Sequence, residues 1–264
     1  MELAEKKYKR IIAGRKRRAA KRKFFLFLRI LLMLVFFTAL IWGFNYFYNS
    51  SYFKISSIII KGNFHYDSEL IKKEAEVVLG LNIFEIDKKY VEEKLEKNLI
   101  WLKSASLKKV FPNKIEIEIT ERKPYLKLVY GGRYYLIDDS GVILEELTDG
   151  GLKDYNDLLL LKNAVKYYPE IGERIAKKNI LGCGQIFQSL DLEIKSEIKE
   201  AFIDDNYTGD IIFVTSGGKR IIFGTSDRLL DKNTLLRQIL GQLSDNDSFY
   251  SYIDLRDVEN PVIK

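Results

Sequence analysis

The sequence of 264 residues predicts an α+β protein in which one membrane-spanning helix precedes two folded domains. A long uncharged apolar run lies near the N-terminus. A pattern of strand, two helices and two strands follows it, and short β-branched runs then continue to the C-terminus. We therefore expect a single transmembrane helix, a small β-α-α-β-β domain, and a second, mainly-β domain with helices packed on the sheet.

The apolar run, residues 24–48, predicts a transmembrane helix. Residues 30–44 carry no charge, and the whole run exceeds the roughly 20 residues that a helix needs to cross a bilayer core. Arg29 lies near one end, where its long side chain can reach the headgroups, and aromatic residues from Trp42 to Tyr48 are typical of the opposite interface. A cleaved signal peptide would have a shorter apolar region and a small-residue cleavage site. We therefore predict a permanent single-span anchor.

The charge on the two flanks predicts the orientation of this anchor. Residues 1–23 form a basic arm with eleven Lys or Arg and two Glu, whereas Lys54 is the only charged residue in 49–57. The positive-inside rule places the arm in the cytoplasm and everything after the span outside it. A contact of the arm with anionic lipid or a cytoplasmic partner stays open as a secondary role.

The same arm explains the net charge of +6 and the pI near 9.0, because the chain after residue 29 carries 31 positive and 35 negative groups. We therefore do not expect binding to nucleic acid. Cys183 is the only cysteine, so the domains outside the membrane must be stable without an intramolecular disulfide.

Residues 52–123 predict the small α+β domain. The clearest signal is residues 114–122, where isoleucines alternate with glutamates as expected for a strand with one buried face. Asp67 and Asp87 are N-cap candidates for two helices, and Gly80 is the expected stop of the first. The expected elements, in order, are strand 53–61, helix 67–80, helix 87–99, strand 104–110 and strand 114–122.

Several short motifs occur in order along this domain, directly after the basic arm and the one span. They are Ile60-Lys61-Gly62-Asn63, Asn82-Ile83-Phe84-Glu85-Ile86-Asp87, Trp101 with Ala105, Phe111-Pro112, and Glu121-Arg122-Lys123-Pro124. In their order and spacing, these motifs and elements resemble the POTRA domain of the FtsQ/DivIB family of bacterial division proteins.

Residues 124–258 predict the second, mainly-β domain, and residues 259–264 a short C-terminal tail. Residues Asp138 to Gly141 predict a hairpin turn. Residues 148–168 show the least clear pattern of helix or strand in the domain. The hairpin and the distal strands again resemble the family's β domain. The expected elements are strands 125–130, 133–137 and 142–144, a buried strand or helix at 158–161, a helical segment within 173–189, strands 201–204, 210–215 and 219–223, a helix from Asp227 or Asp231 to Leu243, and strand 250–256.

The sequence predicts no catalytic, cofactor-binding or metal-binding site. His65 is the only histidine and lies in a predicted loop without a nearby nucleophile, so we interpret it as a turn or surface residue. Cys183 lies between two glycines without a cationic neighbour and is interpreted as a packed residue. Asp138 and Asp139 are adjacent, which favours a role in the turn over an acid/base pair. Gly217-Gly218-Lys219 is interpreted as a hairpin tip, since no phosphate-binding motif surrounds it.

The resemblance implies a non-catalytic single-pass scaffold of the division machinery, located at the septum, without a cofactor or small-molecule substrate. It implies FtsL-like and FtsB/DivIC-like bitopic coiled-coil proteins as partners, and control of septal wall synthesis. The alternatives are a POTRA-type docking or chaperone-like protein of envelope assembly that is not specific to division, and an envelope enzyme such as a wall hydrolase.

The strand 250–256 is the most attractive contact surface. If it lies near the sheet edge, its free N–H and C=O groups could pair with a partner strand. Tyr250 and Tyr252 would then share one face as aromatic anchors, or both would pack on the helix that ends at Leu243. After Arg256 only eight residues remain, so any further edge strand must be short. The partner-binding candidates are Tyr250, Tyr252, Asp254 and Arg256.

Overall fold

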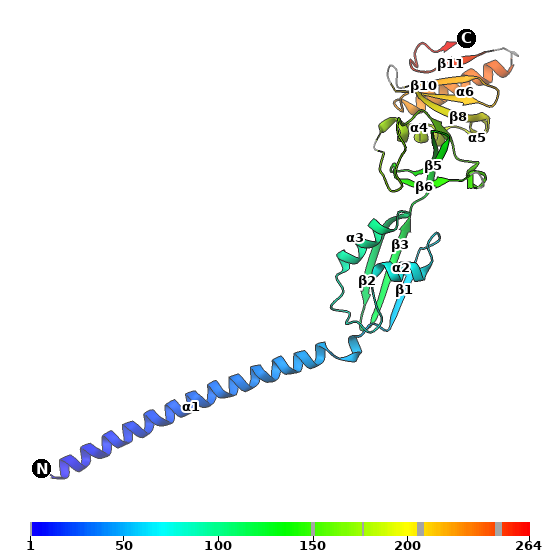
Figure 1. The fold of residues 1–264 in the computed structure, drawn as a ribbon. Helices are drawn as coiled ribbons and strands as arrows, with labels where there is room; N and C mark the ends of the chain where they lie inside the picture. The colour runs from blue at the N-terminus through cyan, green and yellow to red at the C-terminus, as the bar shows by residue number, and fades with distance from the viewer. Residues whose placement is uncertain (1, 149–150, 176, 205–208, 246–249) are drawn as a thin grey trace.

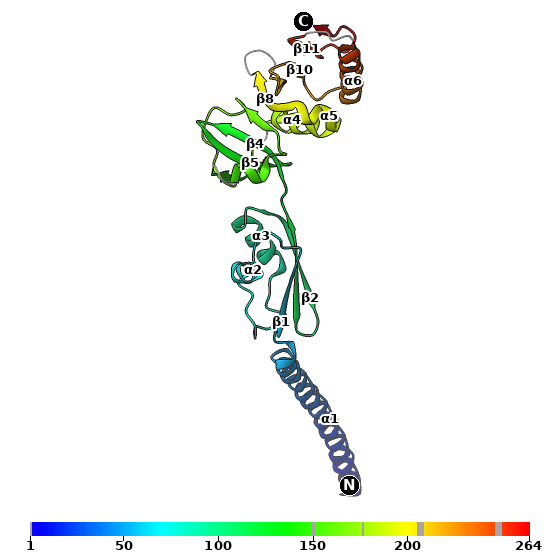
Figure 2. The ribbon, with the colours of Figure 1, turned by 90° about the vertical axis from the view of Figure 1, so that its right-hand side faces the viewer.

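The computed structural model describes residues 2–148, 151–175, 177–204, 209–245 and 250–264. A long helix, a three-stranded domain and a nine-stranded domain follow one another, so the two termini lie at opposite ends of the molecule (Figures 1 and 2). Helix α1, Glu2–Tyr48, runs without a break through the basic arm and the apolar run. Among the described residues, its portion Lys21–Tyr48 is the one helix long and apolar enough to cross a membrane, and none of it is buried.

The three-stranded domain has the predicted order of elements, with both helices on one face of the sheet (Figure 2). The strand order is β1-β3-β2, with β1 parallel and β2 antiparallel to the central β3. The isoleucines of β3 are buried, which confirms the alternation expected there. Asp87 caps α3 by accepting hydrogen bonds from the backbone N–H groups of Lys89 and Tyr90. The elements are β1 Ser57–Lys61, α2 Ser68–Ala75, α3 Lys88–Asn98, β2 Leu102–Val110 and β3 Lys114–Glu121.

Two boundaries in this domain differ from the prediction. Helix α2 ends at Ala75 rather than near Gly80, because Glu76 adopts a left-handed conformation (φ 51°) and closes the last turn. The segment after Glu76 turns back toward the residues that precede β1, where the Gly80 N–H donates to the carbonyl of Ile55. Residues 51–53 form a short 3₁₀ turn, η1 Ser51–Phe53, so the first strand begins later than expected.

The nine-stranded domain contains, among the described residues, one mixed sheet of order β12-β11-β10-β9-β8-β7-β4-β5-β6. Segment 158–161, left open between strand and helix, contributes to strand β7. Residue 176, which falls in the helical segment predicted within 173–189, lies outside the described residues. The elements are β4 Pro124–Tyr130, β5 Arg133–Asp138, β6 Ile143–Leu147, η2 Gly151–Tyr155, β7 Leu160–Lys162, α4 Lys178–Ser189, α5 Leu192–Glu197, β8 Ile198–Asp204, β9 Asp210–Thr215, β10 Arg220–Gly224, α6 Leu229–Asp245, β11 Tyr252–Asp254 and β12 Val262–Ile263.

The core of this domain lies between the sheet and the helices α4 and α6. Alternate side chains of β8, β9 and β10, including Phe213 and Phe223, pack there against Ile186 and Leu236. Cys183 is fully buried in the same core, and burial raises the pKa of its thiol. On the opposite face, which we call the open face, side chains of these three strands line a groove.

The joint between the two domains contains a buried ion pair. Only two residues separate β3 from β4, and the first of them, Arg122, places Nη1 2.8 Å from Oδ2 of Asp138. The Asp138 side chain is fully buried, and its Oδ1 also accepts from the backbone N–H groups of Ser140 and Val142. Asp138 thus has the turn role expected of it, and in addition ties the hairpin to the preceding domain.

An aromatic cluster completes this joint. Trp101 belongs to the three-stranded domain, yet only 7% of it is exposed because it packs against Leu136, Val142 and Leu144 of the other domain. The ring of His65 stacks on Trp101 with centroids 4.0 Å apart. The expected loop position of His65 is therefore confirmed, and its ring shields the joint.

Candidate partner-binding surface

The strand expected to form the sheet edge lies one position inside it. Strand β11 pairs in parallel with β10, where Tyr252 is beside Arg220, and antiparallel with β12, where Ile253 is opposite Ile263. The N–H and C=O groups of β11 are therefore not free for a partner. Residues 259–264, expected as a tail, instead contain the edge strand, and its two-residue length confirms that any strand after Arg256 must be short.

Strand β12 leaves one row of backbone groups without a neighbour among the described strands. The N–H of Lys264 donates to Tyr252 O at 3.1 Å, and the N–H of Tyr252 donates to Lys264 O at 3.0 Å. Because bonding residues alternate along an antiparallel pair, the N–H and C=O of Ile263 point away from the sheet. The side chains of Val262 and Ile263 are about half exposed. The far end of the sheet thus presents an accessible edge.

The opposite edge of the sheet is covered. Strand β6 lies there, and the N–H of Ile143 donates to Glu173 O while the N–H of Gly172 donates to Ile143 O. The N–H of Ile175 similarly bonds to Gly141 O. Within the described part of this sheet, the edge at β12 is therefore the more accessible one for a further strand.

The two candidate tyrosines lie on different faces, contrary to the expectation that they share one. Tyr250 precedes β11, so the strand's alternation does not apply to it, and it is buried in the core with Ile239. Lys219 Nζ lies 4.0 Å from its ring centroid, and burial raises the pKa of its hydroxyl. Tyr252 lies beside Arg220 on the open face and is half-buried.

Arg256 bonds to two carboxylates, those of Asp254 and Asp210. Arg256 donates from Nε and Nη2 to the Asp254 carboxylate at 3.0 and 2.6 Å, and its Nη1 lies 3.3 Å from Asp210 Oδ2. Burial alone would raise the pKa of Asp254, but the hydrogen bonds from Arg256 lower it below its usual range. These contacts join the ends of β9 and β11, while just over half of the Arg256 side chain stays exposed.

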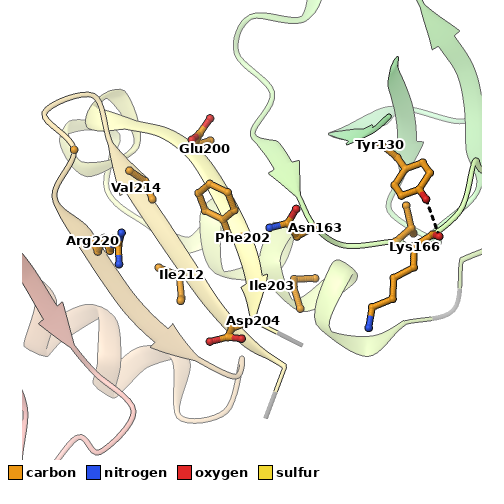
Figure 3. A pocket seen from close by; sticks show the side chains of 12 residues that line it. Tyr130, Asn163, Lys166, Glu200, Phe202, Ile203, Asp204, Ile212, Val214 and Arg220 are labelled. Atoms are coloured by element: carbon orange, nitrogen blue, oxygen red, sulfur yellow. Dashed lines mark hydrogen bonds between the residues drawn. The ribbon is translucent and has the colours of Figure 1, made fainter. Parts of the chain in front are cut away.

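A groove of about 840 Å³ lies on the open face of the sheet (Figure 3). Phe202, Ile212 and Val214 line its centre from β8 and β9. Glu200, which pairs with Lys162 at 2.6 Å, also lines it. Tyr130 lies across the groove, and its hydroxyl donates to the Lys166 carbonyl at 2.8 Å. The open face is therefore apolar in the middle and charged around it.

The comparisons with known proteins cover both domains. Residues 53–122 match the family described as POTRA domain, FtsQ-type, and residues 128–256 match the family described as Cell division protein FtsQ/DivIB, C-terminal. The chain belongs to the FtsQ/DivIB family. Its curated relatives carry the corresponding names, which assigns this family member a role in bacterial cell division.

Two of these relatives and one solved structure show how similar this chain is to other members of the family. Cell division protein FtsQ of Syntrophotalea carbinolica is 28% identical over 221 residues, covering 81% of this chain and 75% of that protein. Cell division protein DivIB of Clostridium botulinum (strain Loch Maree) is 26% identical over 213 residues, covering 80% and 81%. The extracytoplasmic domain of DivIB from Geobacillus stearothermophilus is 15% identical and covers 48% of this chain and 98% of that one, with a TM-score of 0.30.

Sequence reasoning missed the joint residues of this FtsQ/DivIB chain as a group. Arg122 and Trp101 were noted only as parts of motifs, and Asp138 only as a turn residue. The available signal was the position of Arg122 in the two-residue link between β3 and β4. Its buried partner could not be inferred, because it depends on how the two domains meet.

Proposed function

We propose that this chain is a non-catalytic scaffold at the division septum, anchored by α1 with its N-terminus in the cytoplasm. The apolar portion of α1 and the basic arm before it support the orientation. In this arrangement the two domains extend outward from the membrane, as units of residues 52–123 and from 124 to the C-terminal edge strand. The scaffold would couple septal wall synthesis to constriction by holding other division proteins in place.

The observation that carries the proposal is the open edge at β12, at the end of the molecule farthest from α1 (Figure 1). An incoming strand would bond to the N–H and C=O of Ile263, and its side chains would pack beside the exposed Val262 and Ile263. FtsL-like and FtsB/DivIC-like bitopic coiled-coil proteins are the partners that the family resemblance suggests. Such proteins span the same membrane, so they could reach this edge outside it.

The four candidate residues take different parts in this proposal. Tyr252 and Arg256 are accessible and would touch the partner. Tyr250 and Asp254 would act indirectly, because Tyr250 fills the core beneath β11 and Asp254 holds Arg256. Replacing Tyr250 should therefore reduce stability and binding together, whereas replacing Tyr252 should reduce binding alone.

A non-catalytic role fits the placement of the reactive side chains. His65 stacks on Trp101, and Cys183 is buried with its pKa raised. No group of three or more potential metal ligands occurs within the described residues. An assay of the purified chain on isolated cell-wall material provides the check, and robust hydrolysis would contradict a scaffold role.

The decisive experiment combines imaging with an edge variant. A fluorescent fusion to the N-terminus should form a band at midcell during constriction. Ile263→Pro removes an N–H that the fold does not use, and we expect it to weaken binding to the FtsB/DivIC-like protein of the same cell by about tenfold or more. Ile263→Ala keeps the N–H and is the matched control. Unchanged binding by Ile263→Pro would exclude β12 as the contact.

A further inference from the structure

The three-stranded domain is attached directly to the end of α1. The Asn82 side-chain amide donates to the backbone carbonyl of Tyr48, the last helical residue, at 2.6 Å. The rings of Tyr48 and Phe84 stack with centroids 5.4 Å apart, and Phe47 meets Phe53 edge-on at 4.8 Å. The segment that contains Asn82 and Phe84 is therefore held against the point where the helix ends.

Apolar side chains gather around this attachment. Phe84 contacts Phe111 at the tip of the β2–β3 hairpin, with ring centroids 5.5 Å apart. Loop 78–81 is bonded to Ile55 next to η1, so it lies at the same end. Within residues 49–123, all of which are described, eleven large apolar side chains are exposed, and seven belong to this end. We call these seven the membrane-facing base: Tyr52, Val78, Leu79, Leu81, Phe84, Val110 and Phe111.

The end of α1 sets the depth of this base. A hydrocarbon core of about 30 Å takes roughly 20 helical residues, so a span that begins at Phe24 leaves the core near Phe44. Tyr48 lies about 6 Å farther along the helix. The headgroup layer on each side of a bilayer is roughly 5–8 Å thick. A surface in ring contact with Tyr48 therefore lies at headgroup depth when α1 spans the bilayer. In water, such a concentration of exposed apolar side chains would be unusual for a folded domain.

We propose that the membrane-facing base inserts into the headgroup layer of the bilayer that α1 crosses. The base is continuous with the aromatic residues at the end of α1, and apolar contact rather than charge carries the interaction. The exposed groups beside it are of both signs, with Lys54 and Lys114 balanced in part by Glu85. The inference depends on α1 spanning a membrane, and it holds whichever partners the nine-stranded domain binds.

The chain offers a matched pair of reporter positions. Phe111 lies in the base and is 57% exposed, whereas Phe64 is 92% exposed at the other end of the same domain, where its N–H bonds to Glu121. Each is replaced by cysteine in the full-length chain and labelled with an environment-sensitive dye. Cys183 is buried and does not compete for the label. A third label at Trp42→Cys reports on the span itself.

The labelled chains are reconstituted into vesicles of phosphatidylcholine and phosphatidylglycerol that contain lipids spin-labelled near the headgroup. We expect lipid quenching at position 111 to be several-fold stronger than at 64, and iodide quenching from water to be correspondingly weaker. Equal iodide quenching at both positions, without lipid quenching at 111, would overturn the proposal. Absence of quenching at 42 would instead show that the anchor itself failed.

A second variant separates contact by the base from an effect of the dye. With the label at Leu79→Cys, Phe111→Ser should at least halve the lipid quenching, because it removes a neighbouring anchor. Phe64→Ser removes an equally large side chain far from the base and should leave the quenching unchanged. Equal effects of the two variants would contradict a specific contact between base and bilayer.

Discussion

The two ends of the three-stranded domain are joined to their neighbours by different chemistry. At the end that meets the nine-stranded domain, a buried ion pair between Arg122 and Asp138 lies beside the buried ring of Trp101. At the end that meets α1, aromatic rings stack around a single side-chain hydrogen bond from Asn82, and much of the apolar surface stays exposed.

This difference shows how one small domain can be held rigidly on one side and adaptably on the other. A buried ion pair tolerates little displacement, since each charge depends on its partner for the solvation it has lost. Stacked rings lose little when they slide, because offset arrangements of the two rings are also favourable. The domain is therefore suited to fix the direction of the distal sheet while it tolerates small movements of α1.

The largest effect should come from the rigid end. Arg122→Ala leaves the Asp138 carboxylate buried without its partner, which we expect to destabilise the chain by about 3–5 kcal/mol. Thermal unfolding of the full-length chain measures the loss. The double variant Arg122→Met with Asp138→Asn removes both charges but keeps a side-chain oxygen that can accept from the N–H groups of Ser140 and Val142, so it should recover part of the loss. A double variant as unstable as Arg122→Ala would show that shape, rather than charge pairing, maintains the joint.

The same ion pair predicts a pH dependence. Burial of Asp138 opposes its charge, but the bonds from Arg122, Val142 and Ser140 lower its pKa below the usual value of about 3.9. The unfolded chain therefore binds this proton first as pH falls, so the stabilisation is complete above about pH 4 and is lost as pH falls through the folded-state pKa. The stability difference between the unmodified chain and Asp138→Asn should shrink in acid. A difference that stays constant from pH 7 to 3 would contradict the assignment.

At the adaptable end the effect should be smaller. Phe84→Ala removes a ring that contacts Tyr48, Phe53 and Phe111, but 39% of Phe84 is already exposed. We expect a loss of roughly 1–2 kcal/mol in the free energy of unfolding, less than the usual range for a fully buried phenylalanine. Tyr90→Ala, an exposed aromatic on α3, is the control. A loss as large as that of Arg122→Ala would remove the contrast between the two ends.

The smallest effect should come from the exposed ion pair at the rigid end. Lys103 lies 3.0 Å from Asp139, beside the buried pair, but about half of each side chain is in solvent. Lys103→Ala should therefore change stability by less than about 1 kcal/mol, and less again in high salt. A loss comparable to that of Arg122→Ala would mean that the joint depends on total charge rather than on burial.

The parts predicted correctly from the sequence were those with local causes. The alternation of residues 114–122 and the cap at Asp87 each depend on residues within one strand or one helical turn. The return of the last residues as β12 and the separation of Tyr250 from Tyr252 depend on which segments meet in three dimensions. The predicted end of α2 at Gly80 was wrong for a related reason. Glu76 adopts the left-handed conformation that the glycine was expected to supply.

Helix α1 is unbroken from Glu2 to Tyr48, a length of about 70 Å. A continuous helix resists twisting, so a rotation of the basic arm would turn Tyr48 with it, while the stacked rings of Tyr48 and Phe84 allow some slip before the domain follows. The rigid joint at Arg122 would pass the rotation on to the distal sheet. A rotation at the start of α1 could therefore be carried along the helix and through the joint at Arg122 to the distal sheet, with some slip at the contact between Tyr48 and Phe84.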